Sequence, residues 1–320
     1  MALVSALTEK FGIDIPLLLA PMAGVSGGEL AAAVSRAGGL GFIGVGYMEE
    51  DWLRGELAKA GNEKVGVGFI TWVLAQKPHL LPLALDHAPK AIFLSFGEIE
   101  PFAPQVKERG IPLIAQVQTL AQAKRAAKAG ADFIVAQGTE AGGHGAKRAT
   151  FPLVPAIADA VDVPVIAAGG IGDGRGLAAA LMLGACGAVC GSAFYAAPEA
   201  LSHAKAKEQA LGASGDDTQR SSVFDIARGI AWPREWTMRT LKNSFSEKWI
   251  GNMAGLEKAA AQEGERYAEA AAKGDFDTAA IIIGEAVDLV TQSRPAEEIT
   301  RKIAGDAEAL LKNAAANFLR

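Results

Sequence analysis

Residues 131–145 have the sequence Ala131-Asp132-Phe133-Ile134-Val135-Ala136-Gln137-Gly138-Thr139-Glu140-Ala141-Gly142-Gly143-His144-Gly145. The first six residues form a mostly apolar run that indicates a buried strand. The next nine contain four glycines and one histidine. Glycine permits positive φ angles and lets the backbone approach a ligand closely. A strand that ends in such a loop predicts a site, although an isolated glycine-rich loop with one histidine is more often a plain surface loop.

Runs of the same kind recur along the chain. They are nearly continuous and rich in Val, Ile and Leu, as expected of strands that are buried on both faces. We predict eight strands, at Leu17–Ala20, Leu40–Gly44, Lys64–Ile70, Lys90–Ser95, Pro112–Val117, Ala131–Ala136, Pro164–Ala168 and Gly187–Ser192. Helical patterns that stop at a glycine lie between several of these strands, at residues 29–37, 120–129 and 176–183.

The alternation of strands and helices, at about 25 residues per unit, is typical of an α/β protein with a (β/α)8 TIM barrel. A doubly wound open sheet is the alternative, but closure of a barrel accounts for the number of units. The longest spacing between strand starts is 33 residues, and it contains the His144 loop. Loops that follow barrel strands build the active site of this fold. We therefore predict His144 at the C-terminal mouth of the barrel.

The regular alternation stops after the eighth strand. We assign residues 1–211 to the barrel strands and helices. Residues 212–290 begin with a polar, turn-like segment at 212–222, and they are interpreted as a helical insertion, or lid, over the barrel mouth. A long amphipathic helix at 296–318 is expected to return, within residues 291–320, and to close the outer ring of the barrel.

The composition restricts the class of protein. The 320-residue chain is half hydrophobic and carries a formal net charge of −5. A protein that binds nucleic acid electrostatically would be basic, so we expect no nucleic-acid partner. No apolar segment has the length of a membrane span, and the N-terminus lacks a signal-peptide pattern. The cysteines, Cys186 and Cys190, match neither a disulfide framework nor a metal site, and we expect a cytoplasmic protein without a metal.

Two glycine-containing turns predict a phosphate site. Ala168-Gly169-Gly170 follows the seventh predicted strand, and Gly191-Ser192 ends the eighth. Asp173 is placed to cap the helix that begins near Gly174. Loops after strands seven and eight commonly bind phosphate in TIM barrels, although glycine is also frequent in ordinary βα turns. The G-x-G-x-x-G pattern at residues 39–44 lies between a helix and a strand, the reverse of a dinucleotide fingerprint, and is rejected as one.

Two further segments are predicted to face a flat ligand ring. Pro21-Met22-Ala23-Gly24 follows the first strand, and its backbone could line a ring face with Met22 as a soft contact. Gln116 is a polar residue in the otherwise apolar fifth strand. Because a buried amide needs a partner, either a ligand atom or a backbone group is expected near Gln116.

Taken together, the motifs resemble the nitronate monooxygenase (2-nitropropane dioxygenase-like) family of FMN-dependent TIM barrels. The resemblance covers most of the chain. The residues that carry it are Pro21-Met22-Ala23-Gly24, Gly38-Gly39-Leu40-Gly41, Glu140-Ala141-Gly142-Gly143-His144, residues 168–176, Gly191-Ser192-Ala193-Phe194 and residues 238–243.

The resemblance implies bound FMN, with His144 as the catalytic residue over its reactive part and Glu140 orienting the loop. The residues expected to bind the cofactor, including those of the turns above, are Pro21, Met22, Ala23, Gly24, Gly68, Gln116, Gln137, Gly142, Gly143, Ala168, Gly169, Gly170, Gly191 and Ser192.

The implied reaction is the oxidation of alkyl nitronates, or of nitroalkanes, by O2 to carbonyl compounds and nitrite. His144 could remove the α-proton of a neutral nitroalkane, or bind the nitro group as an imidazolium. Related barrels reduce quinones or enoyl thioesters with NAD(P)H, and this reductase activity stays open as the alternative. A non-catalytic flavin or phosphate carrier is a third option. The expected partners are a small-molecule substrate and O2, and a homodimer is one option for the assembly.

Overall fold

The computed structural model describes residues 3–319, and its central element is an eight-stranded parallel sheet. The strands are β1 (Leu17–Leu19), β2 (Phe42–Gly44), β3 (Gly66–Ile70), β4 (Ile92–Ser95), β5 (Leu113–Val117), β6 (Phe133–Gln137), β8 (Val165–Ala168) and β9 (Ala188–Cys190). Their order is β1-β9-β8-β6-β5-β4-β3-β2. A parallel bridge between Leu18 and Leu40 joins the two edges, so the sheet closes into the predicted TIM barrel.

Each of the eight predicted strands is present, within a few residues at its ends. The runs are continuously apolar because successive side chains face two different apolar environments. Inside the barrel, Leu18, Phe42 and Phe93 pack in one cluster with side chains of the other strands. On the outside, Leu17 and Leu19 belong to a second cluster, which includes the surrounding helices.

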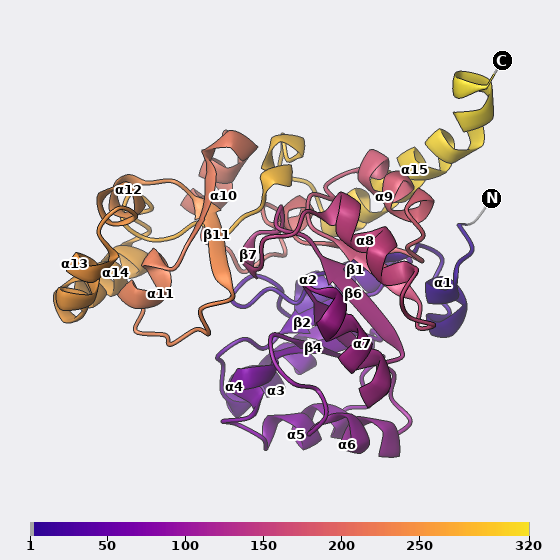
Figure 1. The fold of residues 1–320 in the computed structure, drawn as a ribbon, viewed down its shortest axis with the longest axis horizontal. Helices are drawn as coiled ribbons and strands as arrows, with labels where there is room; N and C mark the ends of the chain where they lie inside the picture. The colour runs from indigo at the N-terminus through magenta and orange to yellow at the C-terminus, as the bar shows by residue number, and fades with distance from the viewer. Residues whose placement is uncertain (1–2, 320) are drawn as a thin grey trace.

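The helices surround the sheet, as Figure 1 shows. Those that accompany the barrel are α1 (Ala6–Phe11), α2 (Gly28–Arg36), α3 (Glu50–Ala60), α4 (Thr71–Leu74), α5 (Leu80–Asp86), α6 (Ala103–Glu108), α7 (Leu120–Ala129), α8 (Thr150–Ala158) and α9 (Gly174–Met182). The predicted helix boundaries near α2, α7 and α9 are confirmed to within a few residues. The side chain of Asp173 accepts hydrogen bonds from the amides of Arg175 and Gly176, which confirms it as the cap of α9.

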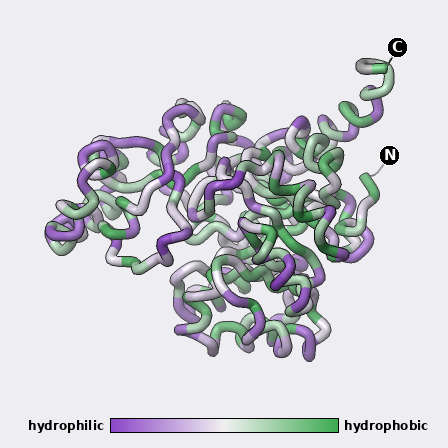
Figure 2. The backbone as a smooth tube through the Cα atoms, in the orientation of Figure 1, coloured by the Kyte–Doolittle hydropathy of each residue, from purple (hydrophilic) through white to green (hydrophobic). Residues whose placement is uncertain are grey.

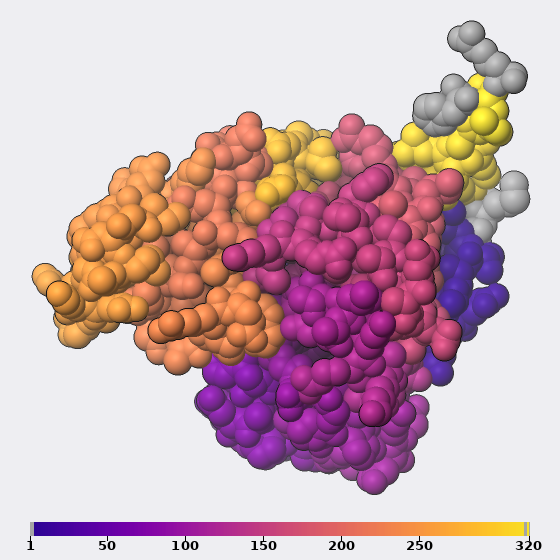
Figure 3. Space-filling model, in the orientation of Figure 1, coloured from indigo at the N-terminus to yellow at the C-terminus, as the bar shows by residue number. Residues whose placement is uncertain are grey.

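The segment after β9 contains both helices and strands. Its helices are α10 (Ala204–Leu211), α11 (Val223–Ala227), α12 (Ser244–Trp249), α13 (Met253–Lys258) and α14 (Ala260–Lys273). Its strands, β10 (Thr218–Ser221) and β11 (Thr237–Leu241), form a three-stranded sheet with β7 (Gly143–Gly145). Part of the segment predicted as turn, 218–221, is therefore a strand. Figure 3 shows this orange region lying against the magenta and purple segments of the barrel.

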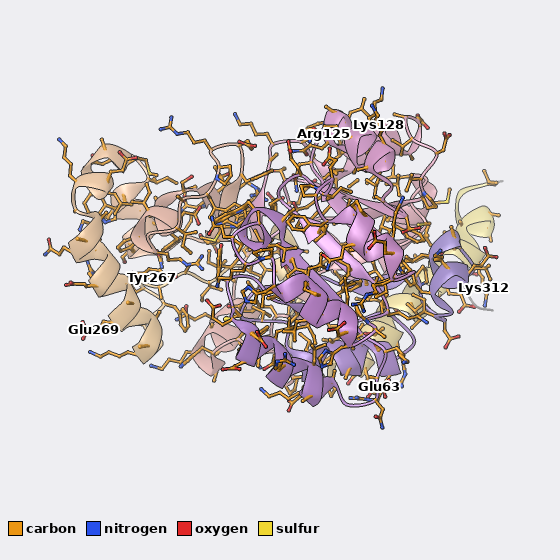
Figure 4. All side chains as sticks on the ribbon, turned by 90° about the horizontal axis from the view of Figure 1, so that it is seen from below. Glu63, Arg125, Lys128, Tyr267, Glu269 and Lys312 are labelled. Carbon is orange, nitrogen blue, oxygen red and sulfur yellow. The ribbon has the colours of Figure 1, made fainter. Side chains whose placement is uncertain are left out.

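The insertion has its own small core. Phe224 of α11 packs against Phe245 of α12 and Tyr267 of α14. Figure 4 shows Tyr267 on the side of α14 that faces the rest of the insertion, and Glu269 on the outer side. Figure 2, coloured by hydropathy, shows the apolar segments concentrated in the barrel and polar segments in the outer parts of the insertion. The boundaries at 212 and 290 remain predictions.

The last helix, α15 (Ala296–Phe318), returns to the barrel and packs against α9 and α2. Its bounds are those expected from the sequence, and its final turns extend away from the barrel in Figure 1. Ile303 and Ala307 form its buried face. Among the described helices, none combines the length and the apolar character that crossing a membrane requires.

Candidate active site

His144 lies on a strand and not in an open glycine loop. After β6 the chain turns back and forms β7, which pairs antiparallel with β11 so that His144 lies opposite Met238. Gly142 is needed for this path, because a Cβ at that position would lie 2.5 Å from the carbonyl carbon of Ile283. The histidine is thus fixed by backbone pairing with the insertion, and its ring is only 8% exposed.

Two charged side chains hold the turn before His144. The guanidinium of Arg220 donates to the carbonyl oxygens of Thr139 (2.9 Å), Ala141 (2.8 Å) and Gly143 (3.1 Å). Burial lowers the pKa of Arg220 to about 10. From the other side, the carboxylate of Glu140 accepts hydrogen bonds from the amide and the hydroxyl of Thr150. Glu140 therefore ties the loop to Thr150, and its role in orienting the loop stays a prediction.

The imidazole of His144 is paired with a buried carboxylate from the insertion. Nε2 of His144 lies 3.0 Å from both carboxylate oxygens of Asp225, which is 3% exposed. Since a carboxylate accepts a hydrogen bond, Asp225 fixes the proton on Nε2. Nδ1 has no hydrogen-bond partner among the described residues, so the nitrogen with the free electron pair is Nδ1.

An aromatic side chain covers the histidine ring. Trp232 stacks on His144 with ring centroids 3.4 Å apart and an interplanar angle of 8°. The indole Nε1 of Trp232 donates to the hydroxyl of Tyr47 at 2.7 Å, which connects the insertion to the loop after β2. Burial lowers the pKa of His144, while the Asp225 carboxylate opposes that shift. The lowered pKa favours the neutral ring, whose unprotonated nitrogen can accept a proton.

A chain of amides ties this region to the barrel strands. Nε2 of Gln116 and Nε2 of Gln118 both donate to Oε1 of Gln137, at 3.1 and 2.9 Å. The side chain of Gln137 in turn donates to the carbonyl oxygen of His144, and Oε1 of Gln118 accepts from Trp236. Among the described residues the partner of Gln116 is thus a side-chain amide and not a backbone group, while the expected ligand contact stays a prediction. Oε1 of Gln116 makes no hydrogen bond with any described residue, and Gln116 lines the cavity.

The predicted phosphate turns lie at the same cavity. Gly169 and Gly170 have φ angles of +101° and +73°, a conformation that favours glycine. Their amides, and that of Gly191, donate no hydrogen bond to any group in the described part of the chain. At Gly191 a Cβ would make only ordinary contacts, at 3.4 Å or more, so internal packing does not require a glycine there. Free amides and unfilled space are the features of an oxyanion site.

The cavity brings together nearly all of the predicted site residues. Of the predicted set, His144 and every cofactor candidate except Gly24 line it; Gly24 lies outside the lining. The predicted residues in the lining are Pro21, Met22, Ala23, Gly68, Gln116, Gln137, Gly142, Gly143, His144, Ala168, Gly169, Gly170, Gly191 and Ser192. The hydroxyl of Ser192 accepts a hydrogen bond from the amide of Gly284, and its proton remains available to a ligand.

Sequence reasoning missed the residues that the insertion contributes. Asp225, Arg228 and Trp232 reach the site from positions more than 80 residues after His144, and Tyr47 reaches it from the loop after β2. The sequence offers one indication of Asp225, which is an acidic residue within the otherwise apolar segment Val223–Ala227. A buried carboxylate requires a partner, but the sequence does not show which one.

The chain matches the sequence profile described as nitronate monooxygenase over residues 4–67 and 64–306. The chain belongs to the nitronate monooxygenase family. It is accordingly an oxidoreductase. A protein named nitronate monooxygenase from Neurospora crassa is 31% identical over 344 residues, covering 92% of this chain and 90% of that protein.

Two other comparisons extend the family picture. From Rhodococcus jostii, a protein named (3aS,4S,5R,7aS)-5-hydroxy-7a-methyl-1-oxo-octahydro-1H-indene-4-carboxyl-CoA dehydrogenase is 33% identical over 259 residues, which cover 80% of this chain and 71% of that protein. The solved structure of FabK from Thermotoga maritima superposes with a TM-score of 0.85 at 29% identity, covering 98% of this chain and 99% of that one. The Rhodococcus and Neurospora relatives are therefore named for different substrates.

Proposed function

We propose that this protein oxidises alkyl nitronates, and nitroalkanes after deprotonation, with FMN as cofactor and O2 as oxidant, giving carbonyl compounds and nitrite. The observation that carries the proposal is the pair formed by His144 and Asp225. A buried carboxylate fixes the proton on Nε2 and leaves the electron pair on Nδ1 of His144, a residue that lines the cavity. The family membership and the nitronate monooxygenase relatives support the same reaction.

The residues of the cavity fit a flavin mononucleotide. The free amides of Gly169, Gly170 and Gly191 and the hydroxyl of Ser192 would hold its phosphate. Pro21, Met22 and the amide oxygen of Gln116 would face its ring system. When bound, FMN supplies the electron acceptor for the substrate and the site of reaction with O2.

Removal of the substrate's α-proton is assigned to side chains of the protein. Nδ1 of His144 accepts the α-proton of a neutral nitroalkane, and the Asp225 carboxylate stabilises the imidazolium that results. Trp232 shields one face of the ring from water. A positioned base of this kind contributes roughly 10²- to 10⁴-fold to the rate. A nitronate has already lost this proton, and it needs His144 only as a binding group.

A second candidate is an oxidoreductase that acts on acyl thioesters, including the NAD(P)H-dependent reductases. The carboxyl-CoA dehydrogenase relative from Rhodococcus favours it. The two functions differ in their products, because only the first one releases nitrite.

The experiment is to purify the protein, release the cofactor by heat and identify it by mass, and then assay nitrite formation and oxygen uptake with alkyl nitronates. FMN, together with nitrite formation that does not require NAD(P)H, is the expected result. FAD, no flavin, or turnover only with NAD(P)H would contradict the proposal.

A further inference from the structure

Phe96 has a backbone conformation that a bulky side chain disfavours. Its φ angle is +62°, and among residues 3–319 the other non-glycine residue with a positive φ is Ala88, at +46°. Ala88 lies just after α5, where a helix end commonly takes this conformation, and its side chain is small. Phe96 directly follows β4, and a phenylalanine at positive φ is strained. Strained residues persist only where the surrounding structure holds them, and they concentrate at functional sites.

Contacts with α4 hold the backbone of Phe96. The amide of Trp72 donates to the carbonyl oxygen of Phe96 at 3.2 Å. The next residue, Gly97, has a φ of +150°, and a Cβ there would lie 2.9 Å from Cβ of Thr71. The chain after β4 therefore packs tightly against α4, and this packing restricts the direction in which the Phe96 ring points.

The ring of Phe96 contacts the stack formed by His144 and Trp232. Its centroid lies 6.2 Å from that of His144 and 5.1 Å from that of Trp232, with interplanar angles of 75° and 81°. The ring of Trp236 lies 5.5 Å away, also in an edge arrangement. Contacts of this geometry stabilise aromatic pairs beyond the area that they bury. Phe96 thus joins the end of a barrel strand to His144 and to two side chains of the insertion.

Three side chains restrain the imidazole of His144. Asp225 accepts from Nε2, Trp232 covers one face of the ring, and Phe96 lies across the edge of the stack. Asp225 and Trp232 belong to the insertion, whereas Phe96 belongs to the barrel and lines the cavity together with His144. The glycine turns predicted to bind the cofactor also follow barrel strands. A displacement of about 1 Å at a reacting group can cost about 10²-fold in rate.

We propose that Phe96 is a positioning residue, whose ring fixes the His144–Trp232 stack relative to the barrel and so holds Nδ1 of His144 where it can remove the substrate proton. The proposal rests on the proposed function for the reaction, and on the contacts of Phe96 for the positioning. A glycine at residue 96 would adopt the same φ without strain, but it would leave the stack without this support.

The first experiment measures the environment of His144 without turnover. In the flavin-containing enzyme with ¹³C-labelled histidines, the Hε1 resonance of His144 is assigned by its absence in His144→Ala. Stacking on the indole of Trp232 should shift this resonance upfield when the ring is neutral. Phe96→Leu should move it toward the position of an exposed neutral histidine. Phe102→Leu, a matched change at a buried phenylalanine outside the cavity lining, should leave it unchanged.

Steady-state kinetics provide the second readout. With neutral nitroalkanes, kcat of Phe96→Leu should fall about 10- to 100-fold while KM changes by less than about 3-fold, because the base is displaced and the substrate contacts remain. Turnover of pre-formed nitronates should change by less than about 3-fold, since no proton is removed from them.

The pH profile separates positioning from a loss of stability. Burial lowers the pKa of His144, Asp225 raises it, and Arg228 and Arg220 lower it. Phe96→Leu changes none of these charges but admits water beside the imidazole, so the pKa of His144 should rise. The acidic limb of kcat/KM should therefore move to higher pH. Loss of the Asp225 carboxylate would move it in the opposite direction.

Two small side chains test the strain. Phe96→Gly and Phe96→Ala both lack the ring, and the glycine variant should have the higher Tm because glycine adopts a positive φ freely. Both variants should nevertheless show the displaced His144 resonance and the reduced kcat. Parent kinetics in Phe96→Gly would overturn the proposal, because the ring would then be dispensable.

The resonance also separates this proposal from the proposed function. A His144 resonance that moves in Phe96→Leu and not in Phe102→Leu supports the positioning, even if nitronates are not oxidised. A lower Tm with an unchanged resonance and an unchanged acidic limb would refute it, even if they are oxidised. Phe96→Met, whose flexible side chain fills space without a ring, serves the same comparison if Phe96→Leu does not fold.

Discussion

Replacing Asp225 by asparagine tests the role of the buried pair most specifically. The substitution keeps the size of the side chain but removes the charge that stabilises the imidazolium of His144. The carboxylate has both oxygens 3.0 Å from Nε2, in a site where the two side chains are 8% and 3% exposed. A hydrogen bond to a charged group at such a site contributes about 1.5–3 kcal/mol. With neutral nitroalkanes, kcat/KM should therefore fall about 10- to 100-fold.

The pH dependence of kcat/KM gives an independent test, because the direction of its shift in Asp225→Asn can be predicted. Burial lowers the pKa of His144, and Asp225 raises it. Without the carboxylate that pKa falls further. Because the base acts when it is unprotonated, the acidic limb of kcat/KM should move to lower pH in Asp225→Asn while the plateau drops.

The assay is nitrite release under air, with a neutral nitroalkane and with its pre-formed nitronate. Nitronate turnover should change by less than about 3-fold, because no proton is removed from it. Asp217→Asn, at an exposed aspartate, is the control and should match the parent. Equal losses on both substrate forms, or an acidic limb that moves to higher pH, would refute the assignment of His144 as the base and of Asp225 as the carboxylate that stabilises its protonated form.

Three further changes are predicted. His144→Ala should retain FMN and lose most turnover, more with neutral nitroalkanes than with nitronates; unchanged kinetics on both forms would remove His144 from the mechanism. Gly170→Asp should purify without FMN, since a carboxylate would face the phosphate, whereas Gly170→Ala should lose less; full flavin content in the Asp variant, measured by absorbance, would place the phosphate elsewhere. Arg220→Met leaves partly buried carbonyl groups without a donor and should lower stability by about 3 kcal/mol, a Tm drop of roughly 4–5 °C by calorimetry; a Tm within about 1 °C of the parent would show that these hydrogen bonds contribute little.

The barrel was predictable because its signals are local. Each strand is a run that must be apolar on both faces, and helices such as α7 carry their own cap, with Thr119 at the start and Gly130 at the end. The strands β10 and β11 were missed for the opposite reason. Their sequences, Thr218–Ser221 and Thr237–Leu241, are short and largely polar, and they become strands only by pairing with β7, far away in the sequence.

The site residues also fall into a group with local sequence signals and a group that depends on tertiary contacts. The glycine turns and His144 follow barrel strands, so their place at the mouth follows from the fold class. Asp225 and Trp232 lie on a segment whose docking onto the barrel depends on tertiary contacts, including the bond between Trp232 and Tyr47. No spacing rule links residue 225 to residue 144. Gly142 shows a further limit of sequence reasoning. It was predicted to bind the cofactor, but packing against the Ile283 backbone is by itself enough to require a glycine at this position.

The most direct test of the central claim is to mix the purified enzyme anaerobically with an alkyl nitronate, and in a separate experiment with NADH or NADPH, while following the flavin absorbance. The proposed function predicts that the nitronate changes the flavin spectrum rapidly without any nicotinamide, and that nitrite appears when O2 is admitted. A flavin that the nitronate leaves unchanged and that NADH or NADPH bleaches rapidly would contradict the claim and assign the protein to the reductases.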